Sequence, residues 1–219
     1  MRNRKQIFPL ILAMLLAFCA CTGQNPTDST TPTNPVSLSQ YDLVCVEYSS
    51  FNGEFPEDGS GRQVQNVAAM LIRNDSAKFL DYALVTCQVG DRTGTFKVTG
   101  LPAGASVWVL EQNGLTLTQR DVFEVKECTD YSFRSDAILQ TDKLQVTTQN
   151  GTVTVTNVSG KTLENVCIYY KTVFSDGNFF GGITYMLGFD TLSPNQTVQK
   201  QTSHFGADSQ IVRYSFLEQ

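Results

Sequence analysis

The stretch VTVTNVSGKTL at residues 153–163 repeats the pattern of MLIRNDSAKFL at residues 70–80, at an offset of 83 positions. Both stretches read as an apolar strand, an Asn-x-Ser-x-Lys turn and a second strand that opens on Leu. A proline turn that leads into a strand follows in each copy, at 101–107 and 192–198, and both copies end on Tyr-Ser-Phe. Three matches in the same order indicate an internal duplication.

Alternation of apolar and polar residues runs through both copies. In TVTVT at 152–156 the valines face one side and the threonines the other, as a half-buried antiparallel strand requires. Turn signals such as Asn150-Gly151 and Asp176-Gly177 separate the strands, and no segment after residue 40 carries a helical apolar stripe. We therefore predict an all-β fold with two tandem immunoglobulin- or fibronectin-III-like antiparallel β-sandwich domains.

The first 21 residues have the charge and hydropathy profile of a secretory signal peptide. Three basic residues precede an apolar stretch at 7–20, which is too short to cross a bilayer comfortably. The stretch ends in LAFCAC, which resembles the lipobox of bacterial lipoproteins, and the resemblance implies cleavage before Cys21 and lipidation of Cys21. Cys19 follows the bulky Phe18 and fits cleavage less well. Ordinary cleavage with free secretion is the alternative.

We predict five parts along the chain. Residues 22–40 consist largely of Thr, Pro, Ser, Asn and Gln and offer little to bury, so they are expected to be disordered. The parts are a lipoprotein signal peptide (1–20), the lipidated Cys21 with its disordered linker (21–40), a first β-sandwich (41–137), a hinge (138–141) and a second β-sandwich (142–219).

Composition narrows the classes of partner. The chain has 16 Lys and Arg against 21 Asp and Glu, and loss of the leader leaves 13 against 21, a net charge of −8. Without a basic block to neutralise phosphates, nucleic-acid binding is not expected. Contact with the membrane is expected through the lipid anchor only, and the folded part is expected to meet a protein or glycan at the cell surface.

Signatures of catalysis are missing from the sequence. His204 is the only histidine, and there is no Gly-x-Ser-x-Gly, His-Glu-x-x-His or phosphate-loop motif. We therefore predict a protein that is not an enzyme and binds no cofactor.

Aromatic residues suggest a ligand site in the second copy. Aromatic rings at the rim of a sandwich can stack on sugars or anchor a partner protein, but they can equally fill a core around the bend that Gly181-Gly182 permits. Trp108 faces away from its apolar neighbours, so it either covers a contact between domains or is exposed to ligand. The candidate ligand-binding residues are Phe179, Phe180, Tyr185, His204 and Trp108.

A glycine-rich loop at 51–61 carries three carboxylates, of Glu54, Glu57 and Asp58. Calcium favours oxygen ligands in loops of this kind, but the alternating Asp/Asn pattern of a recognised calcium loop is missing, so we predict no metal site and keep calcium as an alternative. Two of the carboxylates in an acid–base pair, as in glycoside hydrolysis, are a further alternative. Among the cysteines, Cys45 and Cys128 are the pair most suited to a disulfide.

Several motifs of the second copy resemble a family of uncharacterised surface lipoproteins of Gram-positive bacteria. The motifs are NVSGK at 157–161, VCIYYK at 166–171, GGITY at 181–185 and SHF at 203–205. The resemblance implies β-sandwich domains on the extracytoplasmic face of the cell membrane, and it implies no functional residues. We therefore expect a lipid-anchored, non-catalytic interaction or adhesion module, with a carbohydrate-binding surface protein as the alternative.

Overall fold

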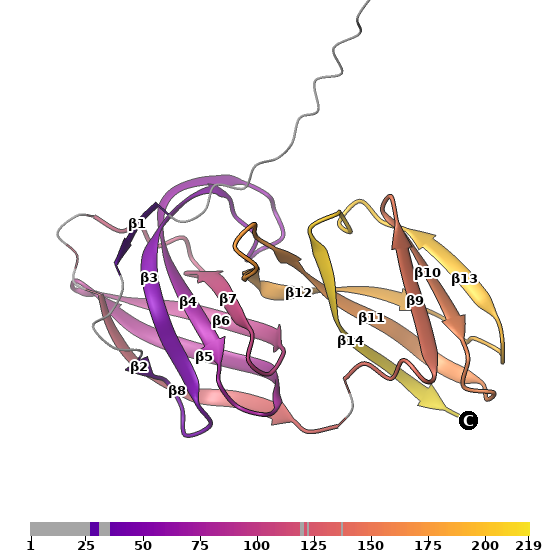
Figure 1. Cartoon of the computed structure of the whole chain (residues 1–219). Helices are drawn as coiled ribbons and strands as arrows, with labels where there is room; N and C mark the ends of the chain where they lie inside the picture. Colours follow the sequence, from indigo (N-terminus) through magenta and orange to yellow (C-terminus); the bar gives the residue numbers. More distant parts are fainter. Residues whose placement is uncertain (1–26, 31–35, 119–120, 122, 137) are drawn as a thin grey trace, which may run out of the picture.

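The computed structural model describes residues 27–30, 36–118, 121, 123–136 and 138–219 (Figure 1). The predicted signal peptide and Cys21 lie outside the described residues. The part of the chain that is described contains strands and no helix, and so no helix long and apolar enough to cross a membrane. The predicted all-β class is confirmed.

Eight strands lie in the N-terminal half of the described chain, residues 36–136 with the short strand that precedes them. They are β1 (Thr27–Thr30), β2 (Val36–Ser37), β3 (Leu43–Glu54), β4 (Gln63–Asn74), β5 (Phe79–Val89), β6 (Arg92–Leu101), β7 (Ser106–Leu110) and β8 (Phe123–Arg134). The C-terminal half, residues 138–219, contains β9 (Leu144–Gln149), β10 (Thr152–Asn157), β11 (Leu163–Val173), β12 (Phe179–Phe189), β13 (Thr197–Gln201) and β14 (Ser209–Glu218).

One large sheet runs through both halves. Its strand order is β1-β3-β4-β7-β12-β11-β14, with β2 also paired to β3, and the two smaller sheets have the orders β6-β5-β8 and β13-β10-β9. Strand pairs are antiparallel except for β7 and β12, which are parallel and join the halves. Figure 1 shows the halves side by side with β12 reaching from one to the other.

Each half packs two sheets around a hydrophobic core. The first core lies between the β3-β4-β7 part of the large sheet and the β6-β5-β8 sheet, and it contains Met70, Val85 and Phe96. The second lies between β12-β11-β14 and β13-β10-β9, where Val155 and Ile168 are fully buried. The period-two alternation of the sequence therefore corresponds to the inward faces of these strands, as expected for sandwich packing.

A third, smaller cluster covers the other face of β3-β4-β7. Trp108 and Leu110 point to this face, while Val107 and Val109 point into the first core. Phe174 and Phe180, from the C-terminal half, pack against the cluster. Because apolar side chains cover both faces of β7, its sequence SVWVL is a continuous apolar run after Ser106 rather than an alternating one.

Ordered structure begins before residue 41, where the disordered linker was predicted to end. Val36 pairs with Cys45 of β3, and Leu38 is only 1% exposed within the first core. Residues 27–30, which form β1, and residues 36–40 of the predicted linker therefore lie in or against the large sheet, and the apolar side chains of the second segment bury surface that helps to order it.

The repeated Asn-x-Ser-x-Lys turn forms the same network in both copies. Asn74 and Asn157 are fully buried, and the Oδ1 of each accepts hydrogen bonds from the backbone N–H and the hydroxyl of the Ser two residues later. Each Nδ2 donates to the Lys carbonyl of the turn and to two carbonyls of the later turn, at 2.8, 3.1 and 3.2 Å for Asn74 and at 2.7, 2.8 and 3.1 Å for Asn157. This agreement supports the duplication inferred from the sequence.

Replacing Asn157 with Ala should lower the free energy of unfolding by about 1–3 kcal/mol, because buried carbonyls lose their donor. Asn74→Ala should have a similar effect, since its network is equivalent. Urea denaturation measures both, with the exposed amide variant Gln145→Ala as the control that should change little. Equal stability of Asn157→Ala and Gln145→Ala would show that the network does not support the fold.

Candidate functional site

The site is organised by a bulge in β12. Tyr170 of β11 pairs with Tyr185 and Thr172 pairs with Phe180, so residues 181–184 of β12 lie opposite Lys171 alone. Gly181 has a φ of +82°, which favours glycine, and a Cβ on Gly182 would lie 1.8 Å from the carbonyl oxygen of Lys97. The Gly181-Gly182 pair therefore permits both the bend and the close approach of the two halves.

Lys171 satisfies the carbonyls that this bulge leaves without strand partners. It is fully buried, and its Nζ donates to Gly181 O at 2.9 Å, Ile183 O at 2.6 Å and Thr99 O at 3.1 Å. Thr99 belongs to β6, so this ammonium connects both halves. Three carbonyl acceptors are the complement of a protonated amine.

Glu57, in the loop between β3 and β4, supplies the opposite charge. Its carboxylate accepts from Leu110 N at 2.8 Å and from Gly182 N at 2.9 and 3.0 Å. Burial raises the pKa of Glu57 to about 7, against the effect of these N–H donors and of Lys171. Burial likewise lowers the pKa of Lys171 to about 7, against the effect of Glu57. The donors around Glu57 and the acceptors around Lys171 both fit the ionised forms, and the two opposite charges influence each other electrostatically across the junction.

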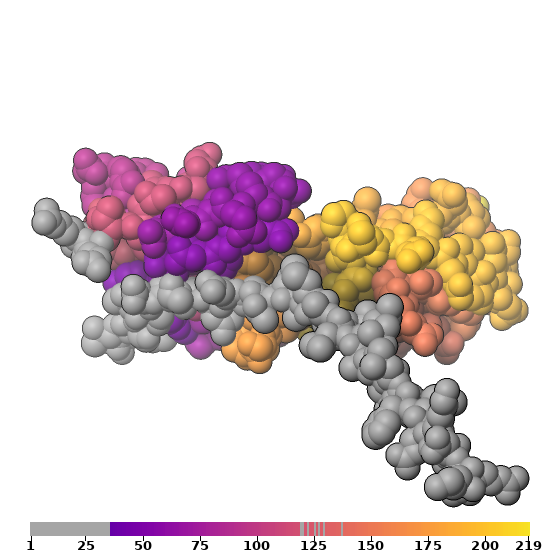
Figure 2. Space-filling view, turned by 90° about the horizontal axis from the view of Figure 1, so that it is seen from above, coloured from indigo at the N-terminus to yellow at the C-terminus, as the bar shows by residue number. Residues whose placement is uncertain are grey.

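A groove with a volume of about 1060 Å³ lies next to these two side chains, at the junction of the halves. Its walls come from the β3–β4 loop at residues 54–61, the end of β11 at 172–175, the aromatic part of β12, and residues 204–210. In Figure 2 the purple surface of the N-terminal half faces the yellow surface of the C-terminal half at this junction. Neither half forms the groove alone.

Two stacked pairs of rings line the groove. Tyr185 and His204 have ring centroids 5.8 Å apart and planes 9° apart, while Phe174 and Phe180 have centroids 4.2 Å apart and planes 22° apart. Tyr170 stacks on Tyr185 from the core side, with ring centroids 5.5 Å apart, and holds this ring in place. The stacking fixes the orientation of these rings, and the outer face of the exposed His204 remains open to the groove.

The charged groups that line the groove are acidic. Glu54 and Asp208 line it and are exposed, and its described lining residues include neither Lys nor Arg. Burial raises the pKa of Tyr185, and the nearby charge of Glu54 adds to the effect, so its hydroxyl stays neutral and available as a donor.

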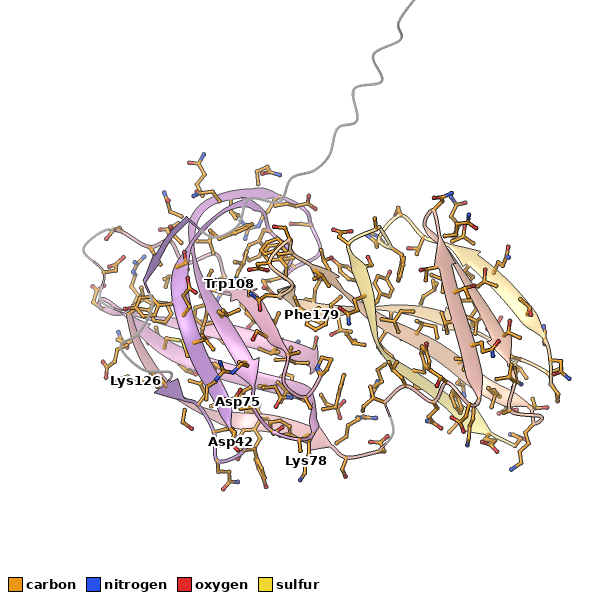
Figure 3. The ribbon with its side chains drawn as sticks, viewed as in Figure 1. Asp42, Asp75, Lys78, Trp108, Lys126 and Phe179 are labelled. Carbon is orange, nitrogen blue, oxygen red and sulfur yellow. The ribbon has the colours of Figure 1, made fainter. Side chains whose placement is uncertain are left out.

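The structure separates the candidate ligand-binding residues into two groups. Phe180, Tyr185 and His204 line the groove. Phe179 and Trp108 are buried, at 5% and 4% exposure, and do not face solvent (Figure 3). A ligand-binding role does not fit these two, because Phe179 completes the first core and Trp108 the third cluster.

The three loop carboxylates have separate partners. Glu54 lines the groove, Glu57 accepts from Leu110 N and Gly182 N, and the Asp58 carboxylate accepts from Ser60 N at 2.9 Å and Arg62 Nε at 3.2 Å. Within the described ranges, no three His, Cys, Asp or Glu side chains gather in a way that could hold a metal ion. The three carboxylates therefore do not form a ligand cluster of the kind that a calcium loop requires.

Cys45 and Cys128, the predicted disulfide pair, are free thiols in the structure, as are Cys87 and Cys167. Burial raises the pKa of Cys45 to about 12 and raises the pKa of Cys128 as well. Their Sγ atoms donate to the carbonyls of Glu47 and Asp130, at 3.6 and 3.5 Å. Both thiols thus act as small buried side chains, with little thiolate available for exchange.

Comparison of the chain with models of known protein families and with curated proteins gives no match. The account of this site therefore depends on its geometry.

Replacing Lys171 with Met should lower the free energy of unfolding by about 3–5 kcal/mol, because three carbonyls would lose a charged donor and the carboxylate of Glu57 would lose a nearby opposite charge. The double variant Lys171→Met with Glu57→Gln should cost less than the sum of the single variants. Chemical denaturation measures the cycle, and Lys126→Met, at an exposed position of β8, is the control. Additive single effects would show that the two side chains do not interact.

Proposed function

We propose that this protein is a non-catalytic binding module, held by a lipid at Cys21 on the extracytoplasmic face of the cell membrane. The observation that carries the binding role is the groove, whose walls come from both halves and are joined beside it by the hydrogen bonds of Glu57 to Gly182 N and of Lys171 to Thr99 O. Pre-formed concave sites with aromatic walls and a few polar groups are typical of ligand binding.

The arrangement of the titratable groups supports binding rather than catalysis. In the groove, Glu54, Asp208 and His204 are exposed. Glu57, the nearby carboxylate with a raised pKa, already accepts hydrogen bonds from two backbone N–H groups and serves to join the halves. A general acid or base needs a free position in reach of a substrate, which Glu57 does not offer.

The N-terminal sequence supports the proposed location at the membrane. It contains three basic residues, an apolar stretch and a cysteine that resembles a lipobox cysteine. The predicted linker that follows Cys21 would serve as the tether. A diacylated cysteine binds durably, since each buried methylene contributes about 0.8 kcal/mol. The same proposal includes membership of the chain in the surface lipoprotein family. It also includes the predicted domain boundaries and the immunoglobulin- or fibronectin-III-like character of the two sandwiches.

Replacing Cys21 with Ser should abolish labelling by a palmitate analogue when the full chain is made in a lipidating bacterium. The wild-type protein should partition into the detergent phase of a phase separation, and the variant into the aqueous phase if it is released. Cys19→Ser is the matched control and should be labelled like the wild type. Labelling of Cys21→Ser at the wild-type level would contradict the proposed anchor.

A further inference from the structure

Flat aromatic faces occupy the parts of the groove that a ligand reaches. His204 is exposed and stacks on Tyr185, whose other neighbour is the buried ring of Tyr170. Phe174 and Phe180 form a second stacked pair. The C–H face of a pyranose ring is apolar and slightly positive, so it complements the negative face of an aromatic ring.

Charge narrows the class of ligand further. The only formal charges on the described lining residues are the carboxylates of Glu54 and Asp208. A phosphorylated, sulfated or uronic ligand would meet like charges and no cation that could offset its desolvation. Anionic ligands are therefore disfavoured.

The remaining polar groups suit a ligand rich in hydroxyls. Ser60, Ser175 and Gln210 line the groove with groups that both donate and accept, and Glu54 and Asp208 accept only. Hydroxyl donors on neighbouring sugar carbons can bind the two oxygens of one carboxylate, in charge-assisted hydrogen bonds. Ligand pockets commonly have volumes of about 300–1,000 Å³, so a groove of this size has room for several sugar rings.

We infer that the ligand of the groove is a neutral oligosaccharide, an inference that rests on the proposed function. The outer face of His204, supported by the ring of Tyr185 beneath it, forms the stacking platform, and the carboxylates of Glu54 and Asp208 accept hydrogen bonds from the sugar hydroxyls. The two halves contribute opposite walls, so the ligand spans the junction between them.

Isothermal titration calorimetry of the full chain in detergent micelles tests the inference. The neutral probes are cellohexaose, maltohexaose, xylohexaose and N-acetylchitohexaose. The charged probes are hexagalacturonate, the glucosamine hexamer and a hexalysine peptide. At least one neutral hexasaccharide should bind, with an affinity that changes little with salt, while hexagalacturonate should not bind.

His204→Ala and Glu54→Gln should each weaken that binding about tenfold, the effect of losing one stacking or charge-assisted contact. Both positions are exposed, so the variants should fold like the wild type. Tyr41→Ala and Glu124→Gln remove an exposed ring and an exposed carboxylate outside the groove, and they should bind like the wild type. Asp208→Asn gives an independent second test on the opposite wall.

The possible failures are distinguishable. Absence of binding by all four neutral probes would overturn the inference. Salt-sensitive binding of hexalysine alone, weakened by Glu54→Gln, would also overturn it but would leave the groove as a binding site. If a neutral probe binds equally to the wild type, His204→Ala and Glu54→Gln, the groove is not the site, and the proposed function fails with the inference.

Discussion

The hydrogen bonds that Glu57 and Lys171 make across the junction are the interactions on which the arrangement of the two halves depends. Two charges in a low-dielectric junction are costly unless each one is satisfied, and here each one is: N–H donors surround the carboxylate and carbonyl acceptors surround the ammonium. An apolar contact could tolerate sliding between the halves. This set of directional bonds tolerates one arrangement, because any shift would leave buried charges without partners.

The bulge in β12 makes these hydrogen bonds possible and also produces the groove. Four residues of β12 lie opposite one residue of β11, which directs carbonyls toward Lys171 and the N–H of Gly182 toward Glu57. The same detour lets the start of β12 pair with β7 while Tyr185 faces the groove. The groove at the junction of the two halves is thus a consequence of the bulge whose backbone groups bind Lys171 and Glu57. Gly181 and Gly182 are essential to it because no other residue type fits both positions.

Local patterns predicted the all-β class, the duplicated turn and the face to which Trp108 points, because each of these depends on neighbours in sequence. The pairing of β7 with β12 depends on segments about 70 residues apart and left no local pattern.

The sequence identified Glu57 only as a loop carboxylate. Val166, Ile168 and Tyr170 point into the core, so the alternation predicts that Lys171 points outward to solvent. In the structure the N-terminal half covers this outward face of β11, and Lys171 is fully buried. The Gly181-Gly182 pair in the strand after Lys171 was the sequence feature that could have indicated a buried Lys171. Phe179 was assigned to a ligand site because apolar residues at a rim and in a core have the same composition.

Cooperativity of unfolding tests most directly whether the two halves form one unit. Differential scanning calorimetry of the purified chain should give a single transition, with the van't Hoff enthalpy equal to the calorimetric enthalpy, because the continuous sheet and the hydrogen bonds of Glu57 and Lys171 across the junction couple the two cores. Two separate transitions, each with the enthalpy expected for about half of the chain, would contradict the account.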